Sequence, residues 1–268
     1  MKLLSENLWL RRFLSLLFLA VLWEILSRTG IIDPFYAPAP SEILRVVFSL
    51  FAEGTILNHL EATFTAALSG LVIGLAIGIG LGFAAALTPL LADLLEPVMM
   101  LLNAIPRVIL APLFVIWLGI ELPSKIALAV VLVAVLIFFA VYSGIKDVNQ
   151  LLVERVWTLG GGNMTLLREV YIPSVTAWVL SSLKVAVGFA FTGAVVGEFV
   201  AATRGLGYLL QFAQSTYNAA LTLGLIFLIM SFVLILFVCA ELIEYRLLRW
   251  RYRTSRDALP TSSTTGSS

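Results

Sequence analysis

The sequence contains few of the residues that soluble proteins use for catalysis, metal binding and surface charge. Its 268 residues include one cysteine, one histidine and only 12% Asp, Glu, Lys and Arg, against about 25% in a typical soluble domain. The lone Cys239 and the lone His59 exclude a disulfide framework and a Cys/His zinc cluster. So little charge cannot cover a compact soluble fold, which argues against a soluble enzyme and against disorder over most of the length.

Apolar residues make up 60% of the chain, and its mean hydropathy is +1.03. The net charge of +1 gives no indication of nucleic-acid binding. There is no G-x-x-x-x-G-K-[ST] motif to bind phosphate, and no spacing typical of a catalytic triad or a metal site. The composition therefore predicts an all-α membrane protein that binds no cofactor itself.

Long uncharged stretches predict the membrane-spanning helices, because about 20 apolar residues cross the hydrocarbon core. Residues 62–92 and 126–145 contain no Asp, Glu, Lys or Arg, and residues 206–240 are long enough for a loop and a span. Two further stretches, 97–120 and 170–197, contain a single cation each.

The first candidate span is the weakest, since Glu24 lies inside it. Arg11 and Arg12 before an apolar run also resemble the start of a signal peptide, but no small-x-small cleavage site follows. We therefore interpret this segment as a retained span. Six helices are predicted, at residues 10–27, 63–87, 94–118, 124–143, 174–199 and 219–243.

Lysine and arginine are distributed unevenly between the predicted connections. One side of the membrane carries four, at Arg28, Arg45, Lys125 and Arg204, and two more cations lie inside spans. The other side carries the remaining eleven: Lys2, Arg11, Arg12, Lys146, Arg155, Arg168, Arg246, Arg249, Arg251, Arg253 and Arg256. Because positive side chains collect on the cytoplasmic side, the bias predicts a multi-pass inner (plasma) membrane protein with both termini in the cytoplasm.

The same bias places the long connection 143–173 in the cytoplasm. We divide the chain into a cytoplasmic N-terminus at 1–9, a six-span transmembrane domain at 10–256 and a disordered tail at 257–268, which is composed mostly of Thr, Ser and Gly.

Glycines recur every four residues in two of the predicted spans. They are Gly70, Gly74, Gly78 and Gly82 in the second span, and Gly193 and Gly197 in the fifth. This spacing places them close to one helix face, where missing side chains let another helix approach. It predicts close packing within the subunit, with a contact between subunits or a gating contact as the alternative.

The third predicted span contains Pro97, Pro106 and Pro112. Each proline lacks a backbone donor and clashes with the preceding turn. Since lipid cannot repair the lost hydrogen bond, we expect a kinked or broken helix that faces protein or a wet cavity.

Four polar residues at predicted membrane depth are candidates for lining a translocation path. Asn103 and Arg107 lie one turn apart in the third span, Lys184 lies in the fifth, and Glu198 lies near the outer end of the fifth. Ionisable groups at this depth normally face the bundle interior or a water-filled path, and the two cations would attract an anionic solute. Interhelical pairing or snorkelling toward the interface is the alternative.

The outer connection 33–61 begins with three prolines, after which Ser41 is a candidate N-cap. The residues that follow, through Phe51, have roughly helical apolar spacing. We expect an amphipathic helix on the outer interface that packs on the bundle, with contact to an extracytoplasmic partner as the alternative.

The cytoplasmic connection is too polar to span and too apolar for a loose linker. It carries one apolar stripe, then Gly160, Gly161 and Gly162, then a second stripe before Pro173 opens the next span. The stripes are Leu151, Leu152, Val156 and Leu159, and Leu166, Leu167 and Val170. This pattern predicts two short helices joined by a glycine turn. Helices this short are marginal in water, so a soluble partner with a groove would complete them.

This connection resembles the EAA loop of binding-protein-dependent ABC importer permeases. That loop contains Glu-Ala-Ala, three residues, Gly, nine residues and Ile-x-Leu-Pro. Here Glu154-Arg155-Val156, Gly160 and Val170-Tyr171-Ile172-Pro173 stand at matching spacing. Arg155 and Val156 replace the two alanines, and Arg155 puts a long cation where the motif has a small residue.

Three further stretches, APAPSEI, NAIPRVILAPLFVIWLGI and VVGEFVAATRGLGYLL, look like the nitrate/sulfonate/taurine branch of these permeases. The resemblance implies a type I, MetI-like six-span subunit that acts as a homodimer. It also implies two ATPase subunits, which would use ATP and Mg²⁺, and an extracytoplasmic solute-binding protein. The coupling residues that it implies are Glu154, Arg155, Val156, Leu159, Gly160, Gly161, Gly162 and Pro173.

We therefore expect a non-catalytic permease subunit that imports a small solute: a nitrate-, sulfonate- or taurine-like anion, or a cofactor precursor. An ion-gradient-driven carrier and a structural membrane subunit without transport are the alternatives. Carriers often show internal repeats and acidic coupling sites at the midplane, whereas this sequence shows no clear repeat and mainly cations at that depth.

Overall fold

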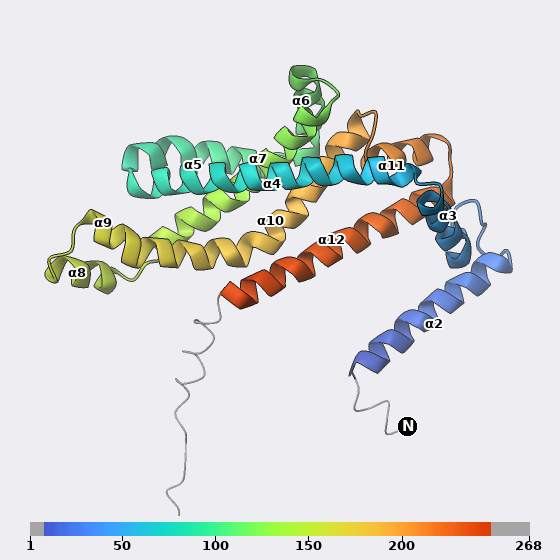
Figure 1. The fold of residues 1–268 in the computed structure, drawn as a ribbon, viewed down its shortest axis with the longest axis horizontal. Coiled ribbons are helices and arrows are strands. Elements are labelled where there is room, and N and C mark those ends of the chain that lie inside the picture. The colour runs from blue at the N-terminus through green and yellow to red at the C-terminus, as the bar shows by residue number, and fades with distance from the viewer. Residues whose placement is uncertain (1–7, 248–268) are drawn as a thin grey trace, which may run out of the picture. The chain divides into compact units, whose positions relative to one another are not determined.

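A computed structural model describes residues 8–247 (Figure 1), and in that part of the chain every regular element is a helix. The all-α prediction is therefore confirmed. Most of the predicted N-terminal segment 1–9 and all of the predicted tail 257–268 lie outside the described residues. The elements are α2 (Leu8–Arg28), α3 (Pro40–Ala52), α4 (Thr55–Leu87), α5 (Pro89–Ala104), η1 (Arg107–Ile109), α6 (Leu110–Leu118), α7 (Leu122–Lys146), α8 (Gln150–Thr158), α9 (Asn163–Leu166), η2 (Leu167–Tyr171), α10 (Ile172–Val200), α11 (Leu206–Ser215) and α12 (Ala219–Leu247).

Four helical runs of the described chain are long and apolar enough to cross a membrane. They are Thr55–Leu87, Leu122–Lys146, Asn163–Val200 and Ala219–Arg246, and they cover the predicted second, fourth, fifth and sixth spans. The first predicted span coincides with α2, but Arg11, Arg12 and Glu24 interrupt its apolar run. Length and composition in the described residues thus support four of the six predicted spans.

The third predicted span is broken at Pro106, as its prolines led us to expect. α5 ends at Ala104, Ile105 is extended with φ −70° and ψ 132°, and the 3-10 turn η1 then leads into α6. The residue before a proline avoids the helical region, which explains the position of the break. Pro97 lies inside α5, and Pro112 lies in the first turn of α6, where proline is tolerated.

The fifth span begins earlier than predicted. Helix continues without a gap from Asn163 through α9, η2 and α10 to Val200, so Pro173 lies inside a helix and does not open one. The five-residue π-helix η2 ends at Tyr171, two residues before Pro173, where a backbone donor is missing. The second predicted short helix is therefore the beginning of the span.

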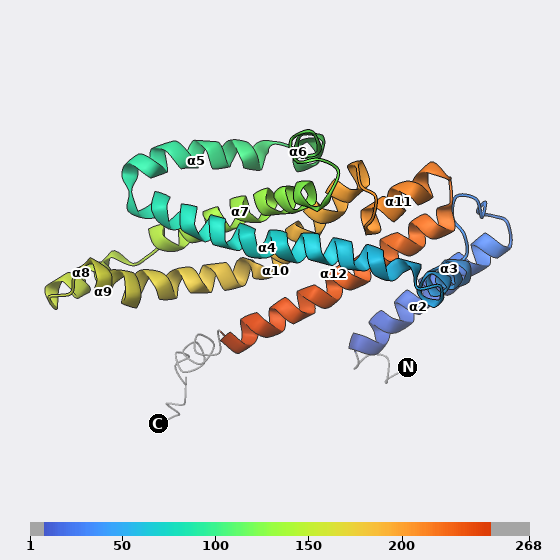
Figure 2. The same cartoon turned by 45° about the horizontal axis from the view of Figure 1, so that its top comes forward.

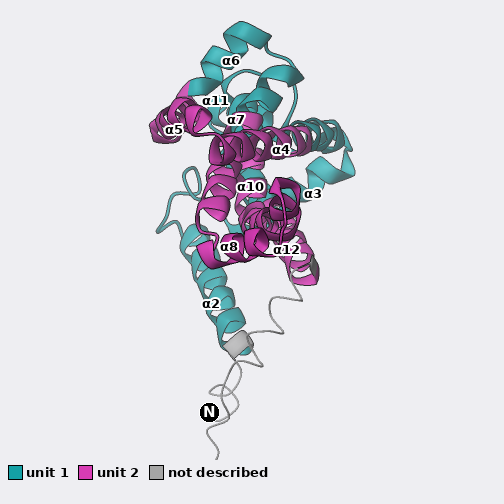
Figure 3. Ribbon diagram, turned by 90° about the vertical axis from the view of Figure 1, so that its left-hand side faces the viewer, with its two compact units in different colours: residues 1–67, 110–128, 193–232 teal, residues 68–109, 129–192, 233–268 magenta. Residues whose placement is uncertain are grey.

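The chain divides into two compact units (Figure 3). Unit 1 contains residues 1–67, 110–128 and 193–232, and unit 2 contains residues 68–109, 129–192 and 233–268. The predicted outer connection 33–61 belongs to unit 1, and the predicted cytoplasmic connection 143–173 belongs to unit 2.

The core of unit 2 forms where the glycines of α4 meet α7 (Figure 2). Gly70, Gly74, Gly78 and Gly82 are all buried. A Cβ atom would lie 2.7 Å from the Val133 Cβ if built on Gly74, and 2.7 Å from the Val141 Cβ if built on Gly82. The two helices therefore approach closely along this face. The core residues are Val133, Ile137, Val141 and Ile145 of α7, with Val175, Ala186 and Ala190 of α10.

In unit 1 the amphipathic helix α3 packs on α12. Ile43 is 3% exposed, and a Cβ atom on Gly224 of α12 would lie 2.9 Å from the Val47 Cγ2. The prediction that Ser41 caps this helix is wrong, because the N-cap residue is Ala39. The Ser41 hydroxyl and N–H instead donate to the Glu24 carboxylate at 2.7 and 3.0 Å. Ser41 therefore links α3 to α2, 17 residues earlier in the chain.

The packing of the glycine face predicts different effects of two alanine substitutions on α4. A Cβ atom at Gly78 would lie 2.7 Å from the Ala134 carbonyl oxygen, whereas at Gly80 it would meet nothing within 4 Å. Overpacking of this kind costs about 1–3 kcal/mol, so Gly78→Ala should lower the thermal unfolding midpoint of the purified subunit in detergent. Gly80→Ala is the matched control and should leave the midpoint unchanged or raise it, because alanine favours a helix interior over glycine. Equal midpoints for both variants would contradict the close contact.

Candidate coupling loop and translocation path

α8 is capped at both ends by residues of its own segment. The Asn149 side-chain oxygen accepts a hydrogen bond from the Leu151 N–H at 2.9 Å. At the other end the Gly161 N–H donates to the Val156 carbonyl at 2.9 Å, and the Gly160 N–H donates to the Trp157 carbonyl at 3.0 Å. These two bonds form a Schellman motif, which requires a left-handed residue just after the helix.

The three glycines of this turn are required to different degrees. Gly160 has φ 78°, a conformation that favours glycine. Gly161 has no positive φ, but a Cβ atom there would lie 2.7 Å from the Val156 Cγ1. Gly162, the N-cap residue of α9, has extended backbone and open space around it. The geometry thus demands glycine at the first two positions and not at the third.

α8 buries none of its side chains against this chain. Trp157 is 51% exposed and Leu159, just after the helix, is 81% exposed. Large exposed apolar side chains mark interaction surfaces, and a nine-residue helix needs something to pack against. We call the exposed apolar residues of this loop the coupling patch, which consists of Leu151, Leu152, Trp157, Leu159 and Met164. Glu154 and Arg155 are also exposed on α8, and Val156 is half-buried.

Two contacts fix the base of the loop to α7. The Ser174 hydroxyl donates to the Gly144 carbonyl at 2.8 Å, and Trp178 packs so closely on Gly144 that a Cβ atom there would lie 2.9 Å from the Trp178 Cδ1. A cleft of about 320 Å³ opens beside this base, and its lining includes Asp147, Glu169 and Trp178. Two carboxylates and an indole ring together can receive a cationic side chain.

Three of the four predicted path residues belong to unit 2. Asn103 is exposed in the last turn of α5 and Arg107 is the first residue of η1, so the two flank the break at Pro106. The side chain of Arg107 lies outside what the structure describes. Lys184 is exposed on α10. Because lipid solvates an ammonium group poorly, an exposed lysine in a membrane helix requires water or another protein surface beside it.

Glu198, the fourth residue, is buried in unit 1 and is only 2% exposed. Its Oε2 accepts hydrogen bonds from the Thr63 hydroxyl and from the Gly207 N–H, both at 2.9 Å. The preceding residue, Gly197, packs on α7, because a Cβ atom there would lie 3.2 Å from the Lys125 Cγ. Glu198 thus connects α10 to α4 and to the start of α11.

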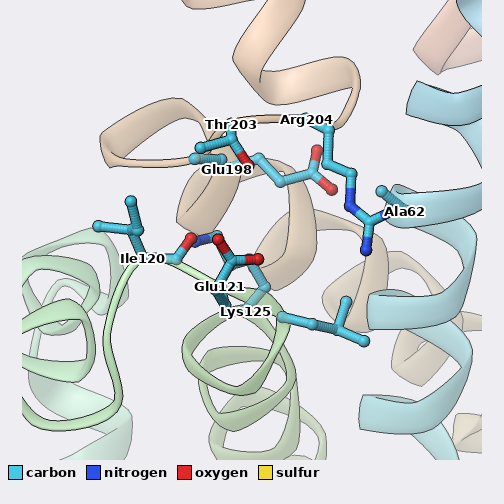
Figure 4. Close-up of a pocket in the computed structure, with 9 residues that line it drawn as sticks. Ala62, Ile120, Glu121, Lys125, Glu198, Thr203 and Arg204 are labelled. Carbon is cyan, nitrogen blue, oxygen red and sulfur yellow. The ribbon is translucent and has the colours of Figure 1, made fainter.

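A small pocket beside Glu198 collects four charged side chains (Figure 4). Its lining includes Glu121, Lys125, Glu198 and Arg204, and its volume of about 20 Å³ has room for little more than one water molecule. Lys125 is 3% exposed, and its ammonium group donates to the Ile120 carbonyl. Two acidic and two basic groups cancel in charge, so this pocket has no excess of positive charge to attract an anion.

The roles of His59 and Thr63 could not be predicted from the sequence. They lie one turn apart on α4, and they accept hydrogen bonds from the N–H groups of Gly205 and Leu206, which are 146 and 143 residues away. The Gly-Leu-Gly run at 205–207 was the available signal, since two glycines flanking a leucine at a helix start indicate a tight backbone contact. Nothing in the sequence shows which residues make that contact.

Comparison with known proteins places these features in a family. Residues 74–251, more than half of the chain, match the model of the family described as binding-protein-dependent transport system inner membrane component. The matched region contains the whole coupling loop, the broken third span and the last three long helices.

Curated relatives resemble the chain over most of its length. It is 34% identical to the riboflavin transport system permease protein RibX of Chloroflexus aurantiacus, over 88% of each chain. It is 31% identical to the formylaminopyrimidine transport permease protein ThiX of Halalkalibacterium halodurans, over 89% of this chain and 94% of ThiX. It is 27% identical to the taurine transport system permease protein TauC of Escherichia coli, over 88% of each chain.

Solved structures show the same fold. A chain of the MetNI methionine ABC transporter in an inward-facing conformation superposes with a TM-score of 0.55 at 20% identity, over 72% of this chain and 93% of that one. A chain of an amino acid ABC transporter crystallised with histidines superposes with a TM-score of 0.60 at 14% identity, over 75% of this chain and 97% of that one. The expected MetI-like architecture is therefore confirmed.

The family match, the relatives and the long apolar helices agree with one another and with the resemblance found in the sequence. They identify a multi-pass inner-membrane protein of the sulfonate/taurine-type branch, without catalytic activity of its own. The chain belongs to the family of binding-protein-dependent transport system inner membrane components and is the permease subunit of an ABC importer.

Proposed function

We propose that this permease acts as a homodimer, receives its solute from an extracytoplasmic solute-binding protein and is driven by ATPase subunits that grip α8 from the cytoplasm. The observation that carries the proposal is the coupling patch. Trp157 and Leu159 are exposed on a capped helix that buries no side chain against its own chain. An apolar groove on a soluble partner would remove this surface from water.

The loop is built to transmit a displacement. The Schellman motif at Gly160 and Gly161 fixes the turn, and the helix that follows runs unbroken from Asn163 to Val200. A movement of α8 therefore reaches the fifth span without passing through a flexible linker. Closure of the ATPase subunits on ATP and Mg²⁺, which those subunits would bind, would shift the spans between inward- and outward-open states. Coupling requires contacts that differ between these states.

The orientation follows from the same proposal. If the coupling patch meets an ATPase, the connection 147–162 faces the cytoplasm, and both termini face the same side as predicted from the distribution of cations. Asn103, Arg107 and Lys184 then lie along the path between two copies, where water or the second subunit would surround the exposed Lys184.

For the solute, we favour a heterocyclic cofactor precursor over a sulfonate-like anion. The relatives named for riboflavin and formylaminopyrimidine transport are 34% and 31% identical to this chain, and the relative named for taurine transport is 27% identical.

Truncating the coupling patch should weaken the complex with the ATPase. Trp157→Ser with Leu159→Ser removes two large apolar contacts, each worth about 1.5–3 kcal/mol when buried, so the dissociation constant should rise at least tenfold. Titration of the ATPase subunit against the detergent-solubilised permease measures this constant. Leu44→Ser is the control, because Leu44 is 59% exposed but lies on α3. Equal affinity of all three proteins would contradict the proposed docking site.

Changing the turn should uncouple the loop without preventing insertion. Proline fixes φ near −65° and has no N–H, so Gly160→Pro cannot form the left-handed turn or the bond to the Trp157 carbonyl. We expect Gly160→Pro and Glu154→Lys to reach normal levels in the membrane but to lower stimulated ATPase activity and solute uptake. Gly162→Ala should behave like the wild type, since Gly162 has extended backbone and open space. Normal uptake by Gly160→Pro would refute the role of the turn.

The proposed solute class is testable with the cognate solute-binding protein. Calorimetric titration with riboflavin, a formylaminopyrimidine, taurine and nitrate should give submicromolar binding of a heterocycle, roughly −8 kcal/mol or stronger, and no heat with the two anions. Uptake of the bound compound by the reconstituted complex then connects binding to transport. Selective binding of taurine or nitrate would replace the heterocycle with an anion and leave the permease assignment untouched.

A further inference from the structure

Side chains from two other helices cap the N-terminus of α11. Three consecutive backbone donors each meet a different acceptor. The Gly205 N–H donates to the His59 Nδ1 at 3.0 Å, the Leu206 N–H to the Thr63 Oγ1 at 2.8 Å, and the Gly207 N–H to the Glu198 Oε2 at 2.9 Å. His59 and Thr63 belong to α4 and Glu198 belongs to α10, so these three residues tie three helices together at one point. We call them the α11 cap.

The position of α11 makes this cap necessary. The first N–H groups of a helix have no partner inside it, and the N-cap residue Gly205 has no side chain to supply one. Leu206 and Gly207 are buried, and the interior of a membrane protein provides little water to replace a missing acceptor. A carboxylate also complements the positive end of the helix dipole.

The Gly-Leu-Gly sequence is shaped to fit the Glu198 side chain. Gly205 has φ 126°, and a Cβ atom built on it would overlap the Glu198 carboxylate. A Cβ atom on Gly207 would lie 2.8 Å from the Glu198 Cβ and 2.9 Å from the Phe199 nitrogen. The backbone of the α10–α11 connection therefore lies directly on α10, and any other residue at 205 or 207 would push it away.

Beyond the cap, further contacts hold α11 inside unit 1. The His59 ring stacks on the Tyr208 ring with centroids 5.9 Å apart and an angle of 5° between the planes. Leu206 and Ala213 are fully buried, whereas Phe212 is 48% exposed. α11 thus has one face held inside unit 1, and the cap fixes the end from which it starts.

The location of Glu198 connects the α11 cap to the coupling turn through a single helix. Glu198 lies in the last turn of the unbroken helix that begins at Asn163, directly after the coupling turn. A displacement that travels along this helix therefore ends at a residue that holds both α11 and, through Thr63, α4.

We propose that Glu198 is the positioning residue through which α10 moves α11, and that the α11 cap is required for solute passage rather than for assembly with the ATPase. This inference rests on the proposed function only for its uptake measurement. The docking of α11 can be measured without solute or ATP. The coupling patch belongs to unit 2 and the cap to unit 1, so substitutions in the cap leave the ATPase-binding residues unchanged.

The docking of α11 is tested by thiol labelling. In a Cys239→Ser background, which removes the lone cysteine, Ala213→Cys places a small reporter at a fully buried position of α11. With the cap intact, the assembled complex should protect this thiol from a maleimide. Glu198→Ala leaves the buried Gly207 N–H without its acceptor and removes the link between Thr63 and α10, so labelling should become roughly tenfold faster. Ser215→Cys, at an exposed position, is the control and should react equally fast with and without the cap.

A second pair of variants covers the case in which Glu198→Ala fails to fold. Thr63→Val is nearly the same shape as threonine but lacks the oxygen that Leu206 requires, so it should expose the Ala213→Cys thiol. Thr63→Ser keeps the hydroxyl and should keep the thiol protected. Equal protection in Thr63→Val and Thr63→Ser, or in Glu198→Ala and the wild type, would overturn the anchoring role.

The link to transport is tested with the reconstituted complex. Glu198→Ala and Thr63→Val should hydrolyse ATP within about twofold of the wild type but take up roughly tenfold less solute per ATP, with an unchanged half-saturating concentration of the loaded solute-binding protein. Faster thiol labelling with normal uptake per ATP would overturn the proposed role in passage. Failure of the wild-type complex to couple ATP to uptake at all would count against the proposed function and would leave the labelling result intact.

Discussion

A backbone N–H or carbonyl group inside a bilayer finds no water, so each interruption of a membrane helix has to be satisfied by protein atoms. Two interruptions in the described part of the chain illustrate that constraint. At Pro106 the chain closes the break with its own backbone, since the Ile105 N–H donates to the Leu101 carbonyl and the Ile109 N–H to the Pro106 carbonyl. At the start of α11 no local acceptor exists, and side chains from α4 and α10 supply three.

The coupling loop represents the opposite case. Hydrogen bonds cap α8 at both ends: Asn149 accepts one at the beginning, and Gly160 and Gly161 donate the Schellman bonds at the end. Its apolar side chains, by contrast, stay uncovered, and Leu159 is 81% exposed. The backbone of this segment is already ordered while its apolar side chains are still exposed. A partner that covers these side chains can therefore bind without the entropy cost of ordering the loop.

Local features could be predicted from the sequence, and contacts across long separations could not. The spacing of Gly74, Gly78 and Gly82 identified the packing face of α4, and the glycine turn identified the end of α8, because each pattern depends on residues within one or two helical turns. The break at Pro106 is local in the same sense. The prediction of Ser41 as an N-cap residue is wrong because its hydroxyl donates to Glu24. Helix-capping preferences do not include such a contact with a residue in another helix.

Contacts across long separations also explain why the roles of the α11 cap residues could not be predicted from the sequence. In the sequence the lone His59 argues only against a zinc cluster, and no pattern singles out Thr63. Their role depends on Gly205 and Leu206, whose positions relative to α4 are set by the packing of the whole unit. Glu198 was recognised as unusual because a charge at that depth is costly, but the cost alone does not say whether water, a cation or a helix end compensates for it.

The geometry of the cap explains why position 198 carries an oxygen acceptor. Glu198 Oε2 accepts from the Thr63 hydroxyl and the Gly207 N–H together. Alanine in its place would leave the buried Gly207 N–H without an acceptor, and an unpaired buried donor costs about 1–3 kcal/mol. Lys125, whose helix packs on the adjacent Gly197, lines the same pocket as Glu198. One side-chain oxygen at this position therefore holds α4 and α11 at once.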